Sequence, residues 1–318
     1  MSESLEDVPI GYIIFAGILY VVLATVLLIL NLMVFVTILR FSEFSTVTYR
    51  IIKNICAACM VQQIIFFISA FMTFFSSGFN PTFEKILGSL VQACWLLYLG
   101  LNLTLAIDRM LTFVCSNLGD KVSFCLLGLS YLHASAHFVL LLLPSFGFVY
   151  CTTSCFGWYY DFKKATSESM DAVEPWILLS IELAIMGCYL VVLRALIKLK
   201  SAASGDGKNF RTELKILLVS VVSFLYEAAL IVFIYWGTNW MEWDHELIIA
   251  VNALWMFDSG VFPLATLVIN TSIRSKLTSL LSRNTLLTKV TSFQNSGPSE
   301  AKSEIHSRKL RPQILFKK

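Results

Sequence analysis

Seven stretches of the chain are long, apolar and almost free of charged residues. A transmembrane helix needs about 20 apolar residues, because it rises about 1.5 Å per residue through a hydrocarbon core of about 30 Å. None of the stretches shows the alternation of about ten residues that is typical of a membrane β-strand. The sequence therefore predicts an all-α membrane protein, a bundle of seven transmembrane helices. The predicted spans are residues 10–39, 51–75, 86–111, 122–148, 174–197, 214–236 and 247–270.

The composition excludes an ordinary soluble protein. The 318 residues are 57% hydrophobic and 14% charged, with a mean hydropathy of +0.74. One core of this size could not bury so much apolar surface. We expect an extracellular N-terminus (1–9), the seven-helix bundle (10–270), an amphipathic helix on the inner leaflet (271–283) and a disordered cytoplasmic tail (284–318).

Basic residues predict the orientation of the bundle. If the N-terminus is outside, the inner loops and span ends hold eleven Lys and Arg residues, against three in the outer loops. Ten more follow in the C-terminal segment, from Arg274 onward. Cytoplasmic loops carry an excess of Lys and Arg, so we expect the N-terminus outside and the C-terminus in the cytoplasm.

The inner end of the third predicted span carries Asp108 and Arg109, after a long uncharged run. An arginine at a span end often extends its charge to the membrane interface, and that alone can explain Arg109. A second interpretation is a switch, in which Asp108, together with Glu213 at the start of the sixth span, holds Arg109 until activation. Breaking that pair would let the sixth span move outward, next to the basic inner loop that contains Lys215.

Three predicted spans each contain one internal acid: Glu182, Glu227 and Asp258. Each charged group inside a bilayer costs about 2.5–3.5 kcal/mol or more, so such residues are candidate functional groups. At about 1.5 Å per residue, Glu227 lies about 20 Å from the inner start of its span and Asp258 about 16 Å from the outer start of its own. If the two face each other, one should be protonated, and the pair would form a latch or the floor of a ligand pocket. Separate neutral acids bonded to nearby hydroxyls or amides are the alternative.

Other candidate pocket residues lie on neighbouring spans. His137 and Glu182 should have similar depth, so they can form a hydrogen bond or simply bond other helices. Trp95, Tyr98 and Trp255 can form aromatic walls for a small, mostly apolar ligand, although aromatic side chains also pack against lipid. His133 and His137 lie at i, i+4, but the spans offer no third His and no metal-protease motif, so we expect neither a metal nor a cofactor.

Cysteine spacing suggests one covalent link. Cys151 and Cys155 lie in the predicted second outer loop, which is oxidising, and they can bridge each other. The remaining cysteines lie mostly within spans, where a small apolar role suffices.

Several motifs resemble those of one receptor superfamily. "LNLTLAIDRM", which contains Asp108 and Arg109, resembles the end of the third helix of rhodopsin-like G-protein-coupled receptors. Asn31 in "LNLMV" and Pro263 in "FPLATLVIN" resemble the Asn of their first helix and the Pro of their seventh. The segments "TYRIIKN", "KILGSLVQACWLLYLGLNLTLAIDR", "WYYD" and "VINTSIR" are similar to nematode serpentine chemoreceptors, particularly class T, and the similarity covers most of residues 30–280.

This resemblance implies a chemosensory (olfactory) receptor that binds a small extracellular ligand and activates a heterotrimeric G protein. It also implies the plasma membrane, including sensory cilia, as the location, with an arrestin or a kinase acting on the C-terminal tail. Membrane lipids surround the bundle, and no nucleic-acid partner or enzymatic activity is expected. The serines that a kinase could modify are Ser292, Ser296, Ser299, Ser303 and Ser307.

The chain departs from the superfamily pattern in several places. Met110 follows Arg109 where Tyr is usual, and Phe262 and Thr266 replace the usual Asn and Tyr of the seventh helix. Span six has no proline, and Cys94 lies too deep for the usual disulfide to the second outer loop. These differences affect the details of the switch more than the architecture.

A carrier or channel is the alternative function, with Glu182, Glu227 and Asp258 as a proton or cation path. Transporters built from duplicated halves usually show internal repeats and interrupted spans, and the sequence shows neither. An intramembrane hydrolase would need a metal triad or a nucleophile–base pair, which is also missing.

Overall fold

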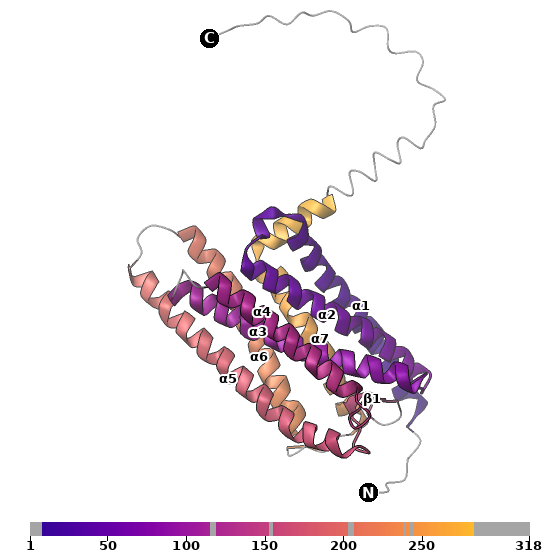
Figure 1. The fold of residues 1–318 in the computed structure, drawn as a ribbon. Coiled ribbons are helices and arrows are strands. Elements are labelled where there is room, and N and C mark those ends of the chain that lie inside the picture. Colours follow the sequence, from indigo (N-terminus) through magenta and orange to yellow (C-terminus); the bar gives the residue numbers. More distant parts are fainter. Residues whose placement is uncertain are drawn as a thin grey trace, which may run out of the picture. The chain divides into compact units, whose positions relative to one another are not determined.

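In the computed structural model, the described residues are 8–114, 119–152, 155–202, 207–237, 240–241 and 244–282; of those between 199 and 213, the backbone alone is described. The chain forms two compact units, Met1–Leu277 and Thr278–Lys318. The first unit contains seven helices that are long and apolar enough to cross a membrane (Figure 1). The structure therefore confirms the predicted all-α bundle. The predicted tail from residue 284 lies outside the described residues.

The seven helices follow the predicted order, with ends that differ from the predicted spans. The bounds are α1 Ile10–Arg40, α2 Val47–Phe74, α3 Pro81–Val114, α4 Gly119–Leu142, α5 Ala165–Ala202, α6 Gly207–Trp236 and α7 His245–Ile269. A short 3₁₀ helix, Ser42–Phe44, precedes α2. Residues 271–282 form a further helix, at the place where the sequence predicts an amphipathic one.

The largest differences concern α4 and α5. Helix α4 ends at Leu142, before Pro144, whereas the predicted span continued to residue 148. Helix α5 begins at Ala165 rather than at residue 174, and Pro175 lies inside it. The prediction placed span starts where charge ends, but a helix can begin with polar residues outside the bilayer. With 38 residues, α5 is the longest helix described.

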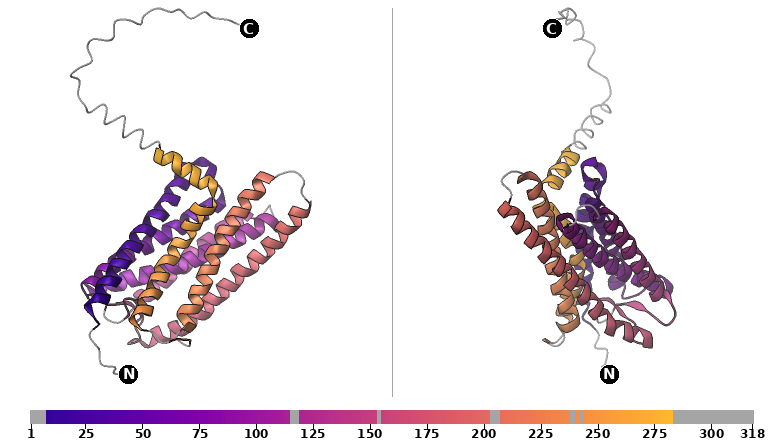
Figure 2. Two further views of the ribbon diagram at one scale, coloured as in Figure 1. Left: turned by 180° about the vertical axis from the view of Figure 1, so that it is seen from behind. Right: turned by 60° about the vertical axis from the view of Figure 1, so that its left-hand side comes forward.

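Helix α3 lies at the centre of the bundle. It contacts α2, α4, α5 and α6, while α1 packs on α2 and α7 (Figure 2). In the most apolar part of α3, 78% of residues are buried, against 28% in α1 and 22% in α4. The remaining surface of α1 and α4 is apolar and suits contact with lipid. Residues of α3 are therefore the best placed to connect the two ends of the bundle.

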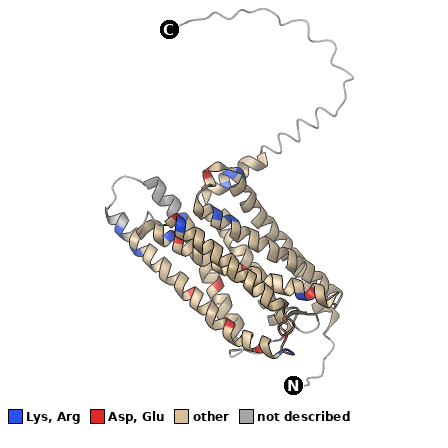
Figure 3. Ribbon diagram, in the orientation of Figure 1, with Lys and Arg blue, Asp and Glu red and all other residues tan. Residues whose placement is uncertain are grey.

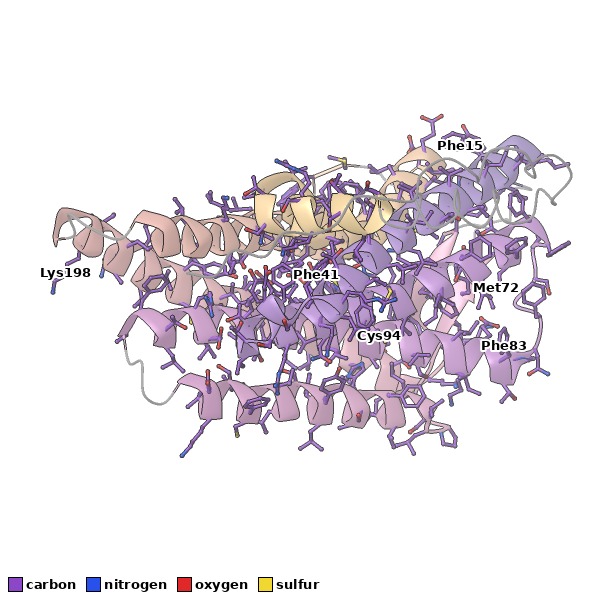
Figure 4. The ribbon with its side chains drawn as sticks, turned by 90° about the horizontal axis from the view of Figure 1, so that it is seen from above. Phe15, Phe41, Met72, Phe83, Cys94 and Lys198 are labelled. Carbon is purple, nitrogen blue, oxygen red and sulfur yellow. The ribbon has the colours of Figure 1, made fainter. Side chains whose placement is uncertain are left out.

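Charged residues concentrate toward the ends of the helices, and few acids lie along their middle (Figure 3). Seen from above, Phe15, Met72 and Phe83 lie at one end of the bundle, Lys198 lies at the opposite end, and Cys94 lies between them (Figure 4). These placements agree with helices that alternate in direction.

The connection between α4 and α5 forms a β-hairpin that the sequence analysis did not predict. Strand β1 (Phe148–Cys151) pairs antiparallel with β2 (Gly157–Tyr160), with Phe148 opposite Tyr160 and Tyr150 opposite Trp158. Both cross-strand pairs are aromatic, with ring centroids 5.0 and 5.1 Å apart. Such pairs stabilise antiparallel strands.

The hairpin is fixed to the bundle by hydrogen bonds and by close packing. Trp158 donates its indole N–H to Ser69 Oγ at 2.9 Å, and the hydroxyls of Tyr150 and Thr73 lie 2.6 Å apart. A Cβ atom at Gly88 of α3 would overlap the carbonyl oxygen of Phe148. Only glycine allows the hairpin backbone to approach α3 so closely.

Candidate functional site

A cavity of about 290 Å³ lies at the hairpin end of the bundle, between α3, α5, α6, α7 and the hairpin. Its polar lining residues include Gln92, Asp171 and Glu174. Most of the other lining side chains are aromatic: Trp95, Phe148, Trp158, Tyr159, Tyr160, Phe162, Tyr235 and Trp255. An apolar, concave site with a few convergent polar groups is typical of a small-molecule pocket.

Two tryptophans that the sequence analysis selected line this cavity. Trp95 and Trp255 pack edge to face with their ring centroids 5.7 Å apart, and Phe66 packs against Trp255 at 5.5 Å. Both indoles are buried, and neither N–H group has a hydrogen-bond partner among the described residues.

Glu174 is the main polar residue of the cavity, and the sequence analysis missed it. It is 3% exposed, and its carboxylate accepts hydrogen bonds from Gln92 Nε2 at 2.5 Å and from the Tyr235 hydroxyl at 3.1 Å. The Tyr160 hydroxyl lies near the carboxylate, outside hydrogen-bonding geometry. Burial and the nearby Glu174 charge both raise the pKa of Tyr160, so this hydroxyl stays protonated.

The sequence contained a signal for this site. Asp171 and Glu174 are three residues apart, so they share one face if the helix extends back to Ala165. We began the predicted span at residue 174, where Glu174 would lie at the membrane interface and need no explanation.

The three internal acids are all buried within the bundle. Glu227 accepts a hydrogen bond from Asn102 Nδ2 at 3.1 Å. Both Glu182 oxygens, Glu227 Oε1 and Asp258 Oδ1 have no hydrogen-bond partner among the described residues. No hydrogen bond joins these acids within the described residues, so the Glu227–Asp258 pair stays a prediction.

The other two predicted pocket residues lie elsewhere. Tyr98 is buried below the cavity, where its hydroxyl lies 2.8 Å from Ser223 Oγ. His137 is buried on α4 and does not form the predicted bond to Glu182, because neither of these side chains reaches a partner among the described residues. Helix counting gave both residues the same depth, but α4 packs on α3 and α2 rather than on α5.

At the opposite end of α3, Asp108 and Arg109 form a buried ion pair. Arg109 Nη2 and Nε donate to Asp108 Oδ2 at 2.6 and 3.1 Å. Thr48 of α2 donates to the same oxygen at 2.9 Å, and Ser123 of α4 donates to Oδ1 at 2.7 Å. The guanidinium also donates to Thr48. The pair therefore joins α2, α3 and α4.

Two further predicted switch residues lie on α6. The side chain of Glu213 lies outside the described part of the chain, so its pairing with Arg109 stays a prediction. Lys215 donates to Thr271 Oγ1 at 2.6 Å and is half-exposed.

Asn31 lies on α1 and Pro263 on α7. Asn31 Nδ2 donates to the carbonyl oxygens of Leu27 and Ser259, both at 3.0 Å, and so joins α1 to α7. Gln63 of α2 donates to the Met256 carbonyl at 2.9 Å and also to the Ser259 hydroxyl. Pro263 is buried within α7, four residues after Ser259.

The predicted disulfide stays a prediction. The backbone N–H of Cys155 lies 3.0 Å from Cys151 Sγ, which places the two residues side by side across the hairpin turn. Among the described residues, no group of three His, Cys, Asp or Glu side chains is arranged to hold a metal ion.

The bundle is similar to that of a known receptor. Squid rhodopsin matches with a TM-score of 0.71 over 87% of each chain, at 13% sequence identity. At that identity the likeness shows the fold alone, a bundle of helices arranged as in squid rhodopsin. A comparison with curated proteins gave no match.

The family itself is shown by sequence. The profile of the family described as "Serpentine type 7TM GPCR chemoreceptor Srt" matches residues 10–290. This match spans most of the chain, so the protein belongs to the Srt family of serpentine chemoreceptors. Membership confirms the predicted receptor family and makes the protein a multi-pass membrane receptor rather than an enzyme.

Proposed function

We propose that this receptor binds a small extracellular molecule in the hairpin-end cavity and activates a heterotrimeric G protein at the Arg109 end. The main support is the position of both sites on α3. Gln92 and Trp95 line the cavity, and Asp108 and Arg109 form the buried pair at the other end. From Gln92 to Arg109 the helix rises about 26 Å, close to the thickness of the hydrocarbon core.

The residues between these sites offer a path for coupling. Trp95 packs on Trp255 of α7, Tyr98 bonds Ser223 of α6, and Asn102 bonds Glu227 of α6. Displacing Trp95 or Trp255 would therefore change contacts between α3, α6 and α7. Ligand contacts that favour one arrangement of these helices would change the affinity for the G protein, and the G protein would change ligand affinity by the same factor.

In this proposal the hairpin faces the outside of the plasma membrane and the Arg109 end faces the cytoplasm. The excess of basic residues at that end supports this orientation. The receptor could serve in sensory cilia, with kinases and arrestin acting on the tail. An epitope at Lys318 should be inaccessible to antibody on intact cells and accessible after permeabilisation.

The direct test measures nucleotide exchange on a purified heterotrimeric G protein by the receptor in lipid discs. Arg109→Ala should remove most of the receptor-catalysed exchange. Arg50→Ala is the matched control. Arg50 is an exposed arginine in the first turn of α2, at the same end of the bundle as Arg109. Undiminished exchange by Arg109→Ala would remove the proposed role of this residue.

The group formed by Glu182, Glu227 and Asp258 favours one other function, the transport of protons or cations. Its unpartnered oxygens are unusual for the interior of a bundle. Ion flux in liposomes that contain the purified protein separates the two functions. An ion flux that is lost in Glu227→Gln would favour transport. A receptor is expected to give no ion flux.

A further inference from the structure

The charges around the cavity all have one sign. Asp171 and Glu174 line it, and its lining residues include no Lys, Arg or His. Glu174 is nearly inaccessible to solvent, so its ionised form is costly unless a cation lies beside it. A cleft lined by one sign of charge and by apolar walls concentrates ligands of the opposite sign. The electrostatics of the cavity thus favour a cation and disfavour an acid.

The unfilled positions beside Glu174 include several acceptors, while the unfilled donors of the lining are the Tyr160 O–H and the two indole N–H groups. A carboxylate has about four acceptor positions, and Gln92 Nε2 and the Tyr235 hydroxyl occupy two of them. Gln92 Oε1 and the Tyr160 hydroxyl are 1% and 4% exposed at the residue level and have no partner within the described residues. An ammonium group has three N–H donors and no acceptor, so it matches this set. A ligand carboxylate would instead place another acid beside Glu174 and Asp171.

The aromatic part of the lining suits an apolar body beside a positive charge. Trp95 and Trp255 present large aromatic surfaces, and Trp158 and Tyr159 cover the hairpin side. Cations are attracted to aromatic faces within about 6 Å of the ring centroid. The volume of about 290 Å³ is near the lower limit of the roughly 300–1,000 Å³ of ligand pockets, so the ligand is small.

We propose that the cavity binds a small organic amine in its cationic form, with the ammonium group at Glu174, Gln92 and Tyr160 and the apolar body on Trp95 and Trp255. This assignment rests on the proposed function for the location of the ligand site, and it adds the chemical class of the ligand. Asp171, at the edge of the cavity, adds a second negative charge on the same face of α5.

The test compares three probes that share one phenyl ring and differ in the charge of the polar end: 2-phenylethylamine, 2-phenylethanol and phenylacetate. Thermal stabilisation of the purified full-length receptor in detergent, at neutral pH, gives the half-saturating concentration of each. We expect the amine to act at a concentration at least tenfold lower than the alcohol, and phenylacetate to be the weakest. A smaller preference, including no stabilisation by any probe, overturns the proposal.

Variants then locate the preference. Glu174→Gln keeps the side-chain shape. It should raise the half-saturating concentration of the amine at least tenfold and change that of the alcohol less than twofold. Asp171→Asn changes the more exposed carboxylate and should raise the half-saturating concentration of the amine by a smaller factor. This variant also tests the proposal if Glu174→Gln does not fold. Glu168→Gln is the matched control, because it removes the same charge from an exposed position outside the cavity. An amine preference that survives both Glu174→Gln and Asp171→Asn assigns the cation to another site and overturns the proposal.

This readout needs no G protein, so the two proposals can fail separately. Amine binding without nucleotide exchange would remove the signalling function and keep the ligand class. Exchange driven by a neutral or acidic ligand in the same cavity would keep the receptor function and remove the ligand class.

Discussion

At the hairpin end of α3, buried polar atoms of Gln92 and Trp95 have no partner within the described residues, whereas at the other end both oxygens of Asp108 accept hydrogen bonds. A buried polar atom without a partner costs about 1–3 kcal/mol. A bound molecule that hydrogen-bonds these atoms would remove that cost at the hairpin end. At the other end, the oxygens of Asp108 already have partners. The ligand-free receptor is thus incomplete at one end and closed at the other.

The largest effect should come from opening the closed end. Asp108→Ala leaves the Arg109 guanidinium buried without its carboxylate, which should cost about 3–5 kcal/mol of unfolding free energy. Chemical denaturation in mixed micelles measures this loss, and basal nucleotide exchange should rise because Arg109 is released. Asp120→Ala, at an exposed position in the first turn of α4, should cost less than about 1 kcal/mol. Equal losses for the two variants would show that the pair does not hold this end closed.

An intermediate effect should come from displacing the hairpin. Gly88→Ala places a Cβ against the Phe148 carbonyl, where backbone must move, and such overpacking costs about 1–3 kcal/mol. Probe binding in the cavity should fall with stability, because Phe148 lines it. Gly128→Ala on α4 has open space around its Cβ and should be neutral or stabilising. If Gly88→Ala binds as well as the unaltered receptor, the hairpin does not shape the cavity.

The smallest effect should come from one hydrogen bond within the incomplete end. Tyr235→Phe removes a donor to Glu174 and should cost about 1–2 kcal/mol, since bonds to charged groups contribute about 1.5–3 kcal/mol and an ordinary one about 1 kcal/mol. Thermal denaturation of the detergent-solubilised receptor measures the change. Tyr226→Phe, which loses a bond to the Leu254 carbonyl, is a matched comparison. A larger loss for Tyr226→Phe would argue that Glu174 depends little on Tyr235.

The sequence analysis predicted the number and order of the spans because a bilayer imposes a minimum apolar length. A constant helical rise also predicts similar depths for Glu227 and Asp258. Depth does not fix rotation, and of the two alternatives for His137 and Glu182 the bond between them is not formed, because both Glu182 oxygens lack a partner among the described residues. Helix α4, which carries His137, packs on α3 and α2.

Glu174 and the hairpin escaped prediction for different reasons. Glu174 stood where charge gives way to apolar sequence, and at such a boundary an acid can equally face water or the bundle. The strands are only four residues each, and we interpreted their aromatic residues as part of an outer loop. Their pairing depends on α2 and α3, which supply Ser69, Thr73 and the space at Gly88.

The length of α5 has a mechanical consequence. Its 38 residues extend about 57 Å, close to twice the thickness of the hydrocarbon core. Such a rod must project beyond the lipid or lean steeply within it. Because Glu174 is near one end, a tilt of about 5° made there displaces the far end of α5 by about 4 Å, so the length of the helix converts a small local adjustment into a larger distant one.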